Sequence, residues 1–162
     1  MRRFTHCREF LMHKKNTSSV IAQNKKARHL YHLAEFTEAG ILLIGPEVKS
    51  LRAGQVNFRD SYVEFRTGEA WLMGLHIAPY TNAGYAEQDP DRDRKLLLHA
   101  GEIRRLAARV EQKGMTLLPV SLYFKHGRVK VEIALGKGKK LYDHRDDMKR
   151  RAEEREMERE FP

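Results

Sequence analysis

Residues 136–151, GKGKKLYDHRDDMKRR, have the clearest capacity for chemistry in this chain. Lysine and arginine side chains dominate the stretch, Tyr142 lies among them, and glycines at positions 136 and 138 keep the backbone open. Cationic side chains bind phosphate groups, and an aromatic ring can stack on a base. Because few of these residues could contribute to a hydrophobic core, the pattern is typical of a flexible basic arm with a polyanionic partner.

Other kinds of chemistry find little support in the sequence. The eight histidines are scattered, and the pair His29 and His32 has no neighbouring cysteine or carboxylate at metal-ligand spacing. The single cysteine, Cys7, excludes a disulfide framework and fits a reducing, cytoplasmic setting. No G-x-S-x-G or P-loop frame is present. We therefore predict no catalytic residue, metal or cofactor, and an RNA-processing enzyme stays a distant alternative.

The amino-acid composition limits the classes of partner that this chain could bind. The chain has 162 residues, 41% of them hydrophobic, which suffices for one domain with a core. Lysine and arginine number 31 against 22 aspartates and glutamates, a formal net charge of +9. This balance favours nucleic acid or an anionic membrane. No apolar run approaches the roughly 18 residues of a membrane span, so nucleic acid is the better interpretation.

The hydrophobic pattern predicts a body made mainly of β-strands. Alternation and turn residues predict strands at residues 31–36, 41–44, 62–66, 70–77, 117–125 and 128–135. Residues 37–40 form a hairpin-sized link between the first two strands. A 3.6-residue period predicts a helix at 102–113 closed by Gly114, and Pro46 opens a short helix at 46–51.

Six strands without βαβ alternation favour a small closed antiparallel barrel with flanking helices. We expect residues 1–23 to be a disordered leader, with Met12 as a possible true start, and residues 24–136 to be the barrel. Residues 137–162 form a basic tail with i,i+4 charge pairs. A helix of this length is marginal in water, so we expect the tail to be disordered when free and helical when bound.

Cationic and flat side chains within the body and tail favour RNA. The cations are Lys25, Lys26, Arg28, Lys130, Lys137, Lys139 and Lys140, with the neutral Asn24 beside the first of them, and the flat groups are His29, Tyr31 and Tyr142. A merely solvated charged face is the alternative interpretation.

Several long motifs occur in a fixed order along the chain. They are NKKARH from residue 24, EAGILLIGPEVKSLRAG from 38, DSYV from 60, DRDRKLLLH from 91, VKVEIALGKGKKLYDHR from 129 and the REMERE ending. Together they resemble the SmpB family of SsrA-binding proteins. The likeness runs from about residue 24 to the C-terminus.

The resemblance implies a barrel of oligonucleotide-binding (OB) type with flanking helices. It also implies a non-enzymatic role: binding the tRNA-like domain of transfer-messenger RNA and delivering that RNA to stalled ribosomes. The family's basic tail is expected to enter the decoding centre and the mRNA path of the small ribosomal subunit. A general RNA-binding or ribosome-associated barrel protein stays the nearer alternative.

The resemblance also places functional residues. The family's RNA contacts fall on Glu38, Leu97 and Lys130, and we expect Asn24, Lys25 and Arg28 to line the same face. A carboxylate is unusual against RNA: Glu38 must either accept a hydrogen bond from a base or ribose, or orient a neighbouring cation. The tail residues that match the ribosome-facing motif are Lys137, Lys139, Lys140, Tyr142, Asp143 and Arg145.

Two positions depart from the family's pattern. Pro46 stands where a threonine or a bulky residue is more usual, which affects only the start of that helix. His144 replaces the usual lysine, so one cation of the tail becomes pH-dependent.

Overall fold

The computed structural model describes residues 19–80 and 89–139, and within these ranges it has nine strands and three helices. The elements are β1 (Ser19–Gln23), α1 (Lys25–Leu30), β2 (Tyr31–Ile41), α2 (Gly45–Arg52), β3 (Val56–Asn57), β4 (Tyr62–Arg66), β5 (Glu69–Met73), β6 (His76–Ile77), β7 (Arg94–Leu97), α3 (Ala100–Lys113), β8 (Thr116–Lys125) and β9 (Arg128–Gly138). The mainly β composition is confirmed.

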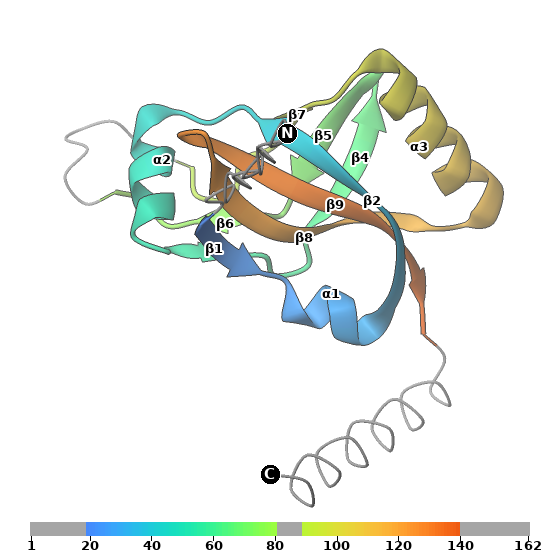
Figure 1. Ribbon diagram of the computed structural model, residues 1–162, viewed down its shortest axis with the longest axis horizontal. Coiled ribbons are helices and arrows are strands. Elements are labelled where there is room, and N and C mark those ends of the chain that lie inside the picture. Colours follow the sequence, from blue (N-terminus) through green and yellow to red (C-terminus); the bar gives the residue numbers. More distant parts are fainter. Residues whose placement is uncertain (1–18, 81–88, 140–162) are drawn as a thin grey trace, which may run out of the picture.

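Six antiparallel strands form a ring. Their order is β8-β4-β5-β7-β2-β9, and β9 pairs again with β8 to complete the circuit. Strand β1 adds to the outer edge of β8, and β3 pairs with β6 in a separate two-stranded sheet. Helices α2 and α3 lie on opposite flanks of the body (Figure 1).

Apolar side chains from most elements fill the interior of the ring. Leu72 of β5, Leu122 of β8 and Val131 of β9 are fully buried, and Leu106 brings α3 onto the same cluster. The predicted alternation of β9 is confirmed, because residues 129, 131, 133 and 135 are all buried. Interdigitation of these chains makes the ring a packed core rather than a pore.

The strongest predicted elements are confirmed. Strand β4 has the expected bounds, and β8 and β9 meet at the His126–Gly127 turn, where both residues have positive φ. Helix α3 ends at Gly114, whose φ of 55° places it in the left-handed conformation of a helix C-cap.

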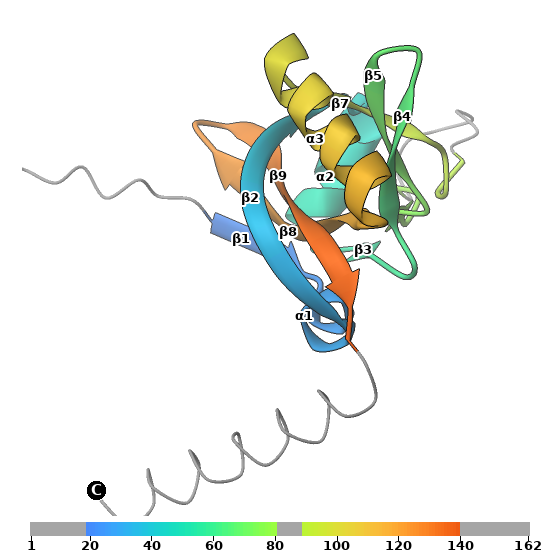
Figure 2. The same cartoon turned by 90° about the vertical axis from the view of Figure 1, so that its right-hand side faces the viewer.

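The predicted hairpin at residues 31–44 is wrong. Residues 31–41 form one long strand that pairs with β9 along most of its length, and Figure 2 shows the two strands curving together toward α1. The register shifts between Ala34 and Thr37, where Glu35 has a φ of 51°, so a bulge lies at residues 35–36, whereas the turn-like residues 37–40 pair regularly with β9.

The boundaries of the body also differ from those that the sequence predicted. Residues 19–23, which we assigned to the leader, form β1 because they pair with residues 121–124 of β8. Strand β9 continues through Lys137 to Gly138, beyond the predicted end of the body. Residues 1–18 and 140–162 lie outside the described ranges, as do the predictions of disorder made for them.

One predicted strand is divided and one short strand was missed. Residues 70–77 split into β5 and β6 around Gly74, whose φ is 67°. Residues 94–97, for which no strand was predicted, form β7 between β5 and β2. These changes matter for function because β7 carries Leu97.

Candidate nucleic-acid interface

A row of residues crosses four adjacent strands on the outside of the ring. Leu97 of β7 pairs with Gly40 of β2, Gly40 pairs with Lys130 of β9, and Lys130 pairs with Tyr123 of β8. Directly paired residues project to the same side of a sheet. The register therefore unites Leu97 and Lys130, which the sequence separates by 33 positions.

Gly40 lets Leu97 lie flat on this surface. A Cβ atom on Gly40 would lie 3.1 Å from the Leu97 Cβ, so Leu97 covers the glycine backbone closely. Leu97 is nevertheless 54% exposed, and its neighbour Leu42 is 55% exposed. The row thus offers an apolar end beside a cationic one, which suits the sugar and base faces of an RNA as well as its phosphates.

Glu38 lies two residues before Gly40, and its carboxylate interacts with three neighbouring side chains. Its Oε2 accepts hydrogen bonds from the Tyr123 hydroxyl at 2.6 Å and from Lys125 Nζ at 2.8 Å. Its Oε1 lies 3.9 Å from Lys130 Nζ. The hydrogen bonds from Lys125 and Tyr123 lower the pKa of Glu38, so this carboxylate is ionised at neutral pH. Burial and Glu38 together raise the pKa of Tyr123, which keeps its phenol protonated as a donor.

Two open hollows adjoin the row, each of about 370 Å³. They share Arg128 and Lys130 as walls. The more apolar hollow is lined by Gly40, Ile41, Leu42, Leu43, Val48, Leu97, Gly127, Arg128, Val129 and Lys130. The more polar one is lined by Glu38, Lys125, His126, Arg128 and Lys130. All three family positions, Glu38, Leu97 and Lys130, therefore border one continuous surface, which we call the β2–β9 face.

Sequence reasoning missed Tyr123 and Lys125 as members of this face. The alternation in residues 117–125 placed them on a strand, but nothing in the sequence indicated which strand would lie opposite. Arg128, at the start of β9, is exposed and lines both hollows. Only the register of β8 on β9 brings Tyr123 beside Lys130.

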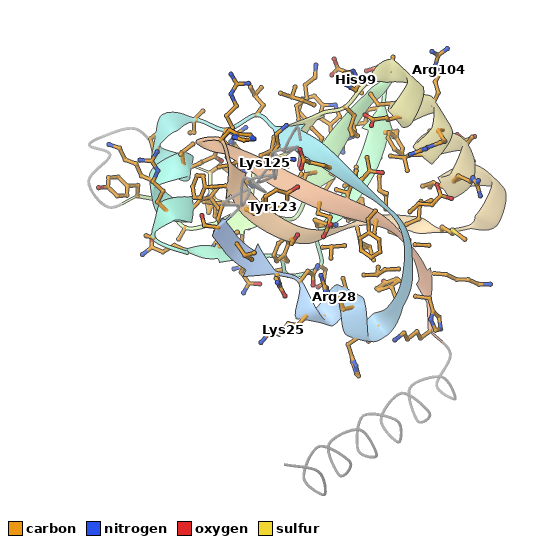
Figure 3. All side chains as sticks on the ribbon, in the orientation of Figure 1. Lys25, Arg28, His99, Arg104, Tyr123 and Lys125 are labelled. Atoms are coloured by element: carbon orange, nitrogen blue, oxygen red, sulfur yellow. The ribbon has the colours of Figure 1, made fainter. Side chains whose placement is uncertain are left out.

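None of the residues of α1 lines either hollow of the β2–β9 face. Helix α1 directly precedes Tyr31, and Glu38 follows seven residues later in the same strand, a path of at most roughly 23 Å along the strand at about 3.3 Å per residue. Figure 3 shows Lys25 and Arg28 on α1, away from Tyr123 and Lys125 on the sheet. That Lys25 and Arg28 contact RNA stays a prediction.

Asn24 serves the helix rather than the surface. It is 5% exposed, its Oδ1 accepts from the Ala27 amide at 2.9 Å, and its Nδ2 donates to the Pro119 carbonyl at 3.0 Å. The first contact is that of a helix N-cap, and the second ties the helix to β8. Lys25 and Arg28 stay exposed.

The chain leaves the described body beside α1. Lys137 pairs with His32 in the last part of β9, and the Lys139 amide donates to the Leu30 carbonyl at 2.9 Å. Lys140, Tyr142, Asp143 and Arg145 lie outside the described residues. The basic arm therefore begins at the α1 end of the molecule, opposite the Glu38 end of β2.

Two further features of the described residues concern metal binding and membrane association. Among the described residues, no group of three or more histidine, cysteine, aspartate or glutamate side chains could hold a metal ion. None of the helices in these ranges is long and apolar enough to cross a membrane.

Comparison with known proteins identifies the family. A family model described as "SmpB protein" matches residues 21–162. An SsrA-binding protein of Nitratidesulfovibrio vulgaris is 70% identical over 144 residues, which cover 89% of this chain and 94% of that protein. An SsrA-binding protein of Oleidesulfovibrio alaskensis is 68% identical over 152 residues, 93% of this chain and 98% of that protein.

A solved structure agrees with these relatives. It is described as "tmRNA-SmpB: a journey to the center of the bacterial ribosome", and it superposes with a TM-score of 0.64 and 53% sequence identity over 74% of this chain and 85% of that chain. This chain therefore belongs to the SmpB protein family.

Proposed function

We propose that this protein binds transfer-messenger RNA and acts with it in ribosome rescue by trans-translation. Relatives with up to 70% identity over 144 residues are SsrA-binding proteins, and the matching solved structure is described with tmRNA and the bacterial ribosome. The protein acts by binding RNA and not as an enzyme. The observation that carries the proposal is the β2–β9 face, where Leu97, Lys130 and Glu38 meet.

The body is best described as a small closed barrel of OB type. Its support is the circuit of six antiparallel strands, with β9 pairing both β2 and β8. OB barrels present strands and adjoining loops to oligonucleotides. In this chain the corresponding surface is built from β2, β7, β8 and β9.

The β2–β9 face receives the tRNA-like domain of the RNA. Lys130 and Arg128 bind phosphates, and Leu97 packs on a sugar or base across the apolar hollow. Both lysine and arginine serve here as cations that position the RNA, while the shape of the hollows supplies selectivity.

The α1 end and the tail form a second surface that faces the ribosome. Lys25 and Arg28 are exposed there, and the arm begins beside them at Lys139. In this proposal Lys137, Lys139, Lys140 and Arg145 supply charge in the decoding centre and mRNA path. Tyr142 stacks on a base there, and Asp143 accepts hydrogen bonds. Asn24 contributes by holding α1 in place.

A binding assay tests the RNA partner. Gel shifts compare the tRNA-like domain of transfer-messenger RNA with an unrelated RNA hairpin of equal length at one fixed salt concentration. We expect the tRNA-like domain to bind far more tightly. Equal affinity for the two RNAs would leave the general RNA-binding alternative in place of the proposed partner.

A further inference from the structure

We infer that Glu38 is a positioning residue that holds Lys125 and Lys130 for RNA, and that Tyr123 and Lys125 belong to the RNA-contacting set. This inference rests on the proposed function and decides between the two roles that a carboxylate could have on this face. In this role Glu38 affects RNA binding by holding Lys125 and Lys130, and it makes no contact of its own with the RNA.

The first support is the occupancy of the carboxylate. Its Oε2 already receives two donors, the Tyr123 hydroxyl at 2.6 Å and Lys125 Nζ at 2.8 Å. Lys130 Nζ approaches the other oxygen at 3.9 Å. A ribose hydroxyl or base amine that bonded to Oε2 would have to displace one of the protein's own donors.

The second support is the geometry of the strands. Glu38 is on β2, Lys130 is on β9, and Tyr123 and Lys125 are on β8. One carboxylate thereby reaches side chains from three neighbouring strands. Lysine side chains are long and lose rotamer freedom when they are fixed against a partner. A group that orients them before RNA arrives removes part of that cost from binding.

The third support is the balance of charge. Lys125, Arg128 and Lys130 lie around Glu38 in the polar hollow, and Glu132, which pairs with Glu38 across β2 and β9, is a second carboxylate beside it. Three cations against two carboxylates leave the site cationic even with both carboxylates ionised. The side chains of Glu38, Lys125 and Lys130 are each about one-third exposed, at 35%, 34% and 31%. They are therefore held by contacts on one side and remain open to RNA on the other.

Tyr123 adds a flat group to this arrangement. Its hydroxyl is fixed by Glu38, and it pairs with Lys130 across β8 and β9. An aromatic ring anchored at its polar end presents a defined edge and face to a nucleotide. Tyr123→Phe would release the hydroxyl while it keeps the ring, which separates anchoring from stacking.

A double-mutant cycle tests the inference. Dissociation constants for the tRNA-like domain are measured with the full chain for the unaltered protein, Glu38→Ala, Lys125→Ala and the double variant. We expect each single change to weaken binding roughly threefold to tenfold. We expect the double variant to have about the same affinity as the single variant that binds RNA less tightly, because Glu38 acts through Lys125.

Three results would overturn the inference. If the two single effects multiply in the double variant, Glu38 and Lys125 act independently, as they would if Glu38 itself contacted RNA. Tighter binding by Glu38→Ala would mean that the carboxylate only repels phosphate, and unchanged binding would mean that it is idle. Lys125→Met provides a second variant that leaves Glu38 intact if the alanine change at position 38 prevents folding.

Two controls complete the design. Glu64→Ala removes a similarly exposed carboxylate, paired with Arg66 on β4, and should leave RNA binding unchanged. The unrelated hairpin is titrated with the same samples. Loss of discrimination by the unaltered protein would refute the RNA partner, whereas the coupling between Glu38 and Lys125 would still report on the role of Glu38.

Discussion

Glu47 and Arg94 form an ion pair inside the protein, with Arg94 Nε donating to Glu47 Oε1 at 2.8 Å. The two residues are 3% and 0% exposed. Arg94 also donates to the carbonyls of Leu75, Pro90 and Arg92, and Arg92 donates to the same carboxylate at 2.6 Å. The pair thereby joins the start of α2 to β7, the strand that presents Leu97 to the β2–β9 face.

Removal of Glu47 should destabilise the fold strongly. Glu47→Ala would leave Arg94 charged and buried without its partner, a situation that costs about 3–5 kcal/mol. Urea unfolding, followed by circular dichroism, measures the change. Glu64→Ala removes an exposed partner of Arg66 and should cost less than about 1 kcal/mol. Equal midpoints for the two variants would contradict this account of the pair.

Acid should weaken the same pair. Burial alone would raise the pKa of Glu47, but hydrogen bonds from Arg92 and Ile44 and the charge of Arg94 outweigh it, so the pKa lies below its ordinary value of 4.5. A lowered native pKa means that the stabilisation is complete above the unfolded pKa and is lost as pH falls through the native one.

The measurement is the free energy of unfolding between pH 7 and pH 3. Stability should fall below about pH 4.5 in the unaltered protein, partly through other carboxylates. Glu47→Gln cannot take up a proton at this position as pH falls, so its curve should be flatter over that range. Parallel curves would show that Glu47 does not contribute to the acid sensitivity.

The strands of the ring were more predictable than their neighbours. Residues 128–135 alternate so regularly that both the strand and its buried face follow from the sequence. Glu38-Ala39-Gly40, by contrast, has the composition of a turn but lies in a strand, because Gly40 accommodates Leu97 and not a reversal of the chain. Local composition could not separate these two uses of glycine.

Of the residues on the β2–β9 face, the sequence indicated only those that correspond to the family's RNA contacts, Glu38, Leu97 and Lys130. Glu38 bonds to residues 85 and 87 positions away in the chain, and such contacts depend on strand register. Register in turn depends on how whole strands pack, which no local pattern encodes. The burial of Asn24 could not be predicted for a related reason: its side chain donates to the Pro119 carbonyl of a distant strand, β8.

Gly40→Ala should weaken RNA binding more than it weakens the fold. The new methyl group would lie 3.1 Å from Leu97 Cβ, so Leu97 would have to shift by a few tenths of an ångström on the β2–β9 face. We expect a modest loss of affinity for the tRNA-like domain in gel shifts. Gly45→Ala is the matched control, because a Cβ there meets nothing within 4 Å. Equal effects of the two variants would remove Leu97 packing from the RNA contact.

Asn24→Ala should cost stability, whereas Lys25→Ala should not. Loss of an N-cap typically costs about 0.5–2 kcal/mol, and here the buried Pro119 carbonyl would also lose its donor. Asn24→Asp keeps the cap acceptor and loses only the donor, so it should lie between the two. Thermal unfolding of the three variants measures this order. A stability loss for Lys25→Ala equal to that for Asn24→Ala would contradict the division between cap and exposed cation.

Ending the chain after Lys139 should separate RNA binding from rescue. The truncated protein keeps the β2–β9 face and the hydrogen bond from Lys139 to Leu30, so it should bind the tRNA-like domain nearly as well as the full chain does. It lacks Lys140, Tyr142 and Arg145 of the proposed ribosome surface, so peptide tagging on stalled ribosomes should be lost. Lys130→Ala should have the opposite pattern. It should weaken RNA binding, and peptide tagging should recover when the protein is supplied in excess. A truncated protein that still tags nascent peptides at the normal rate would show that the body alone engages the stalled ribosome.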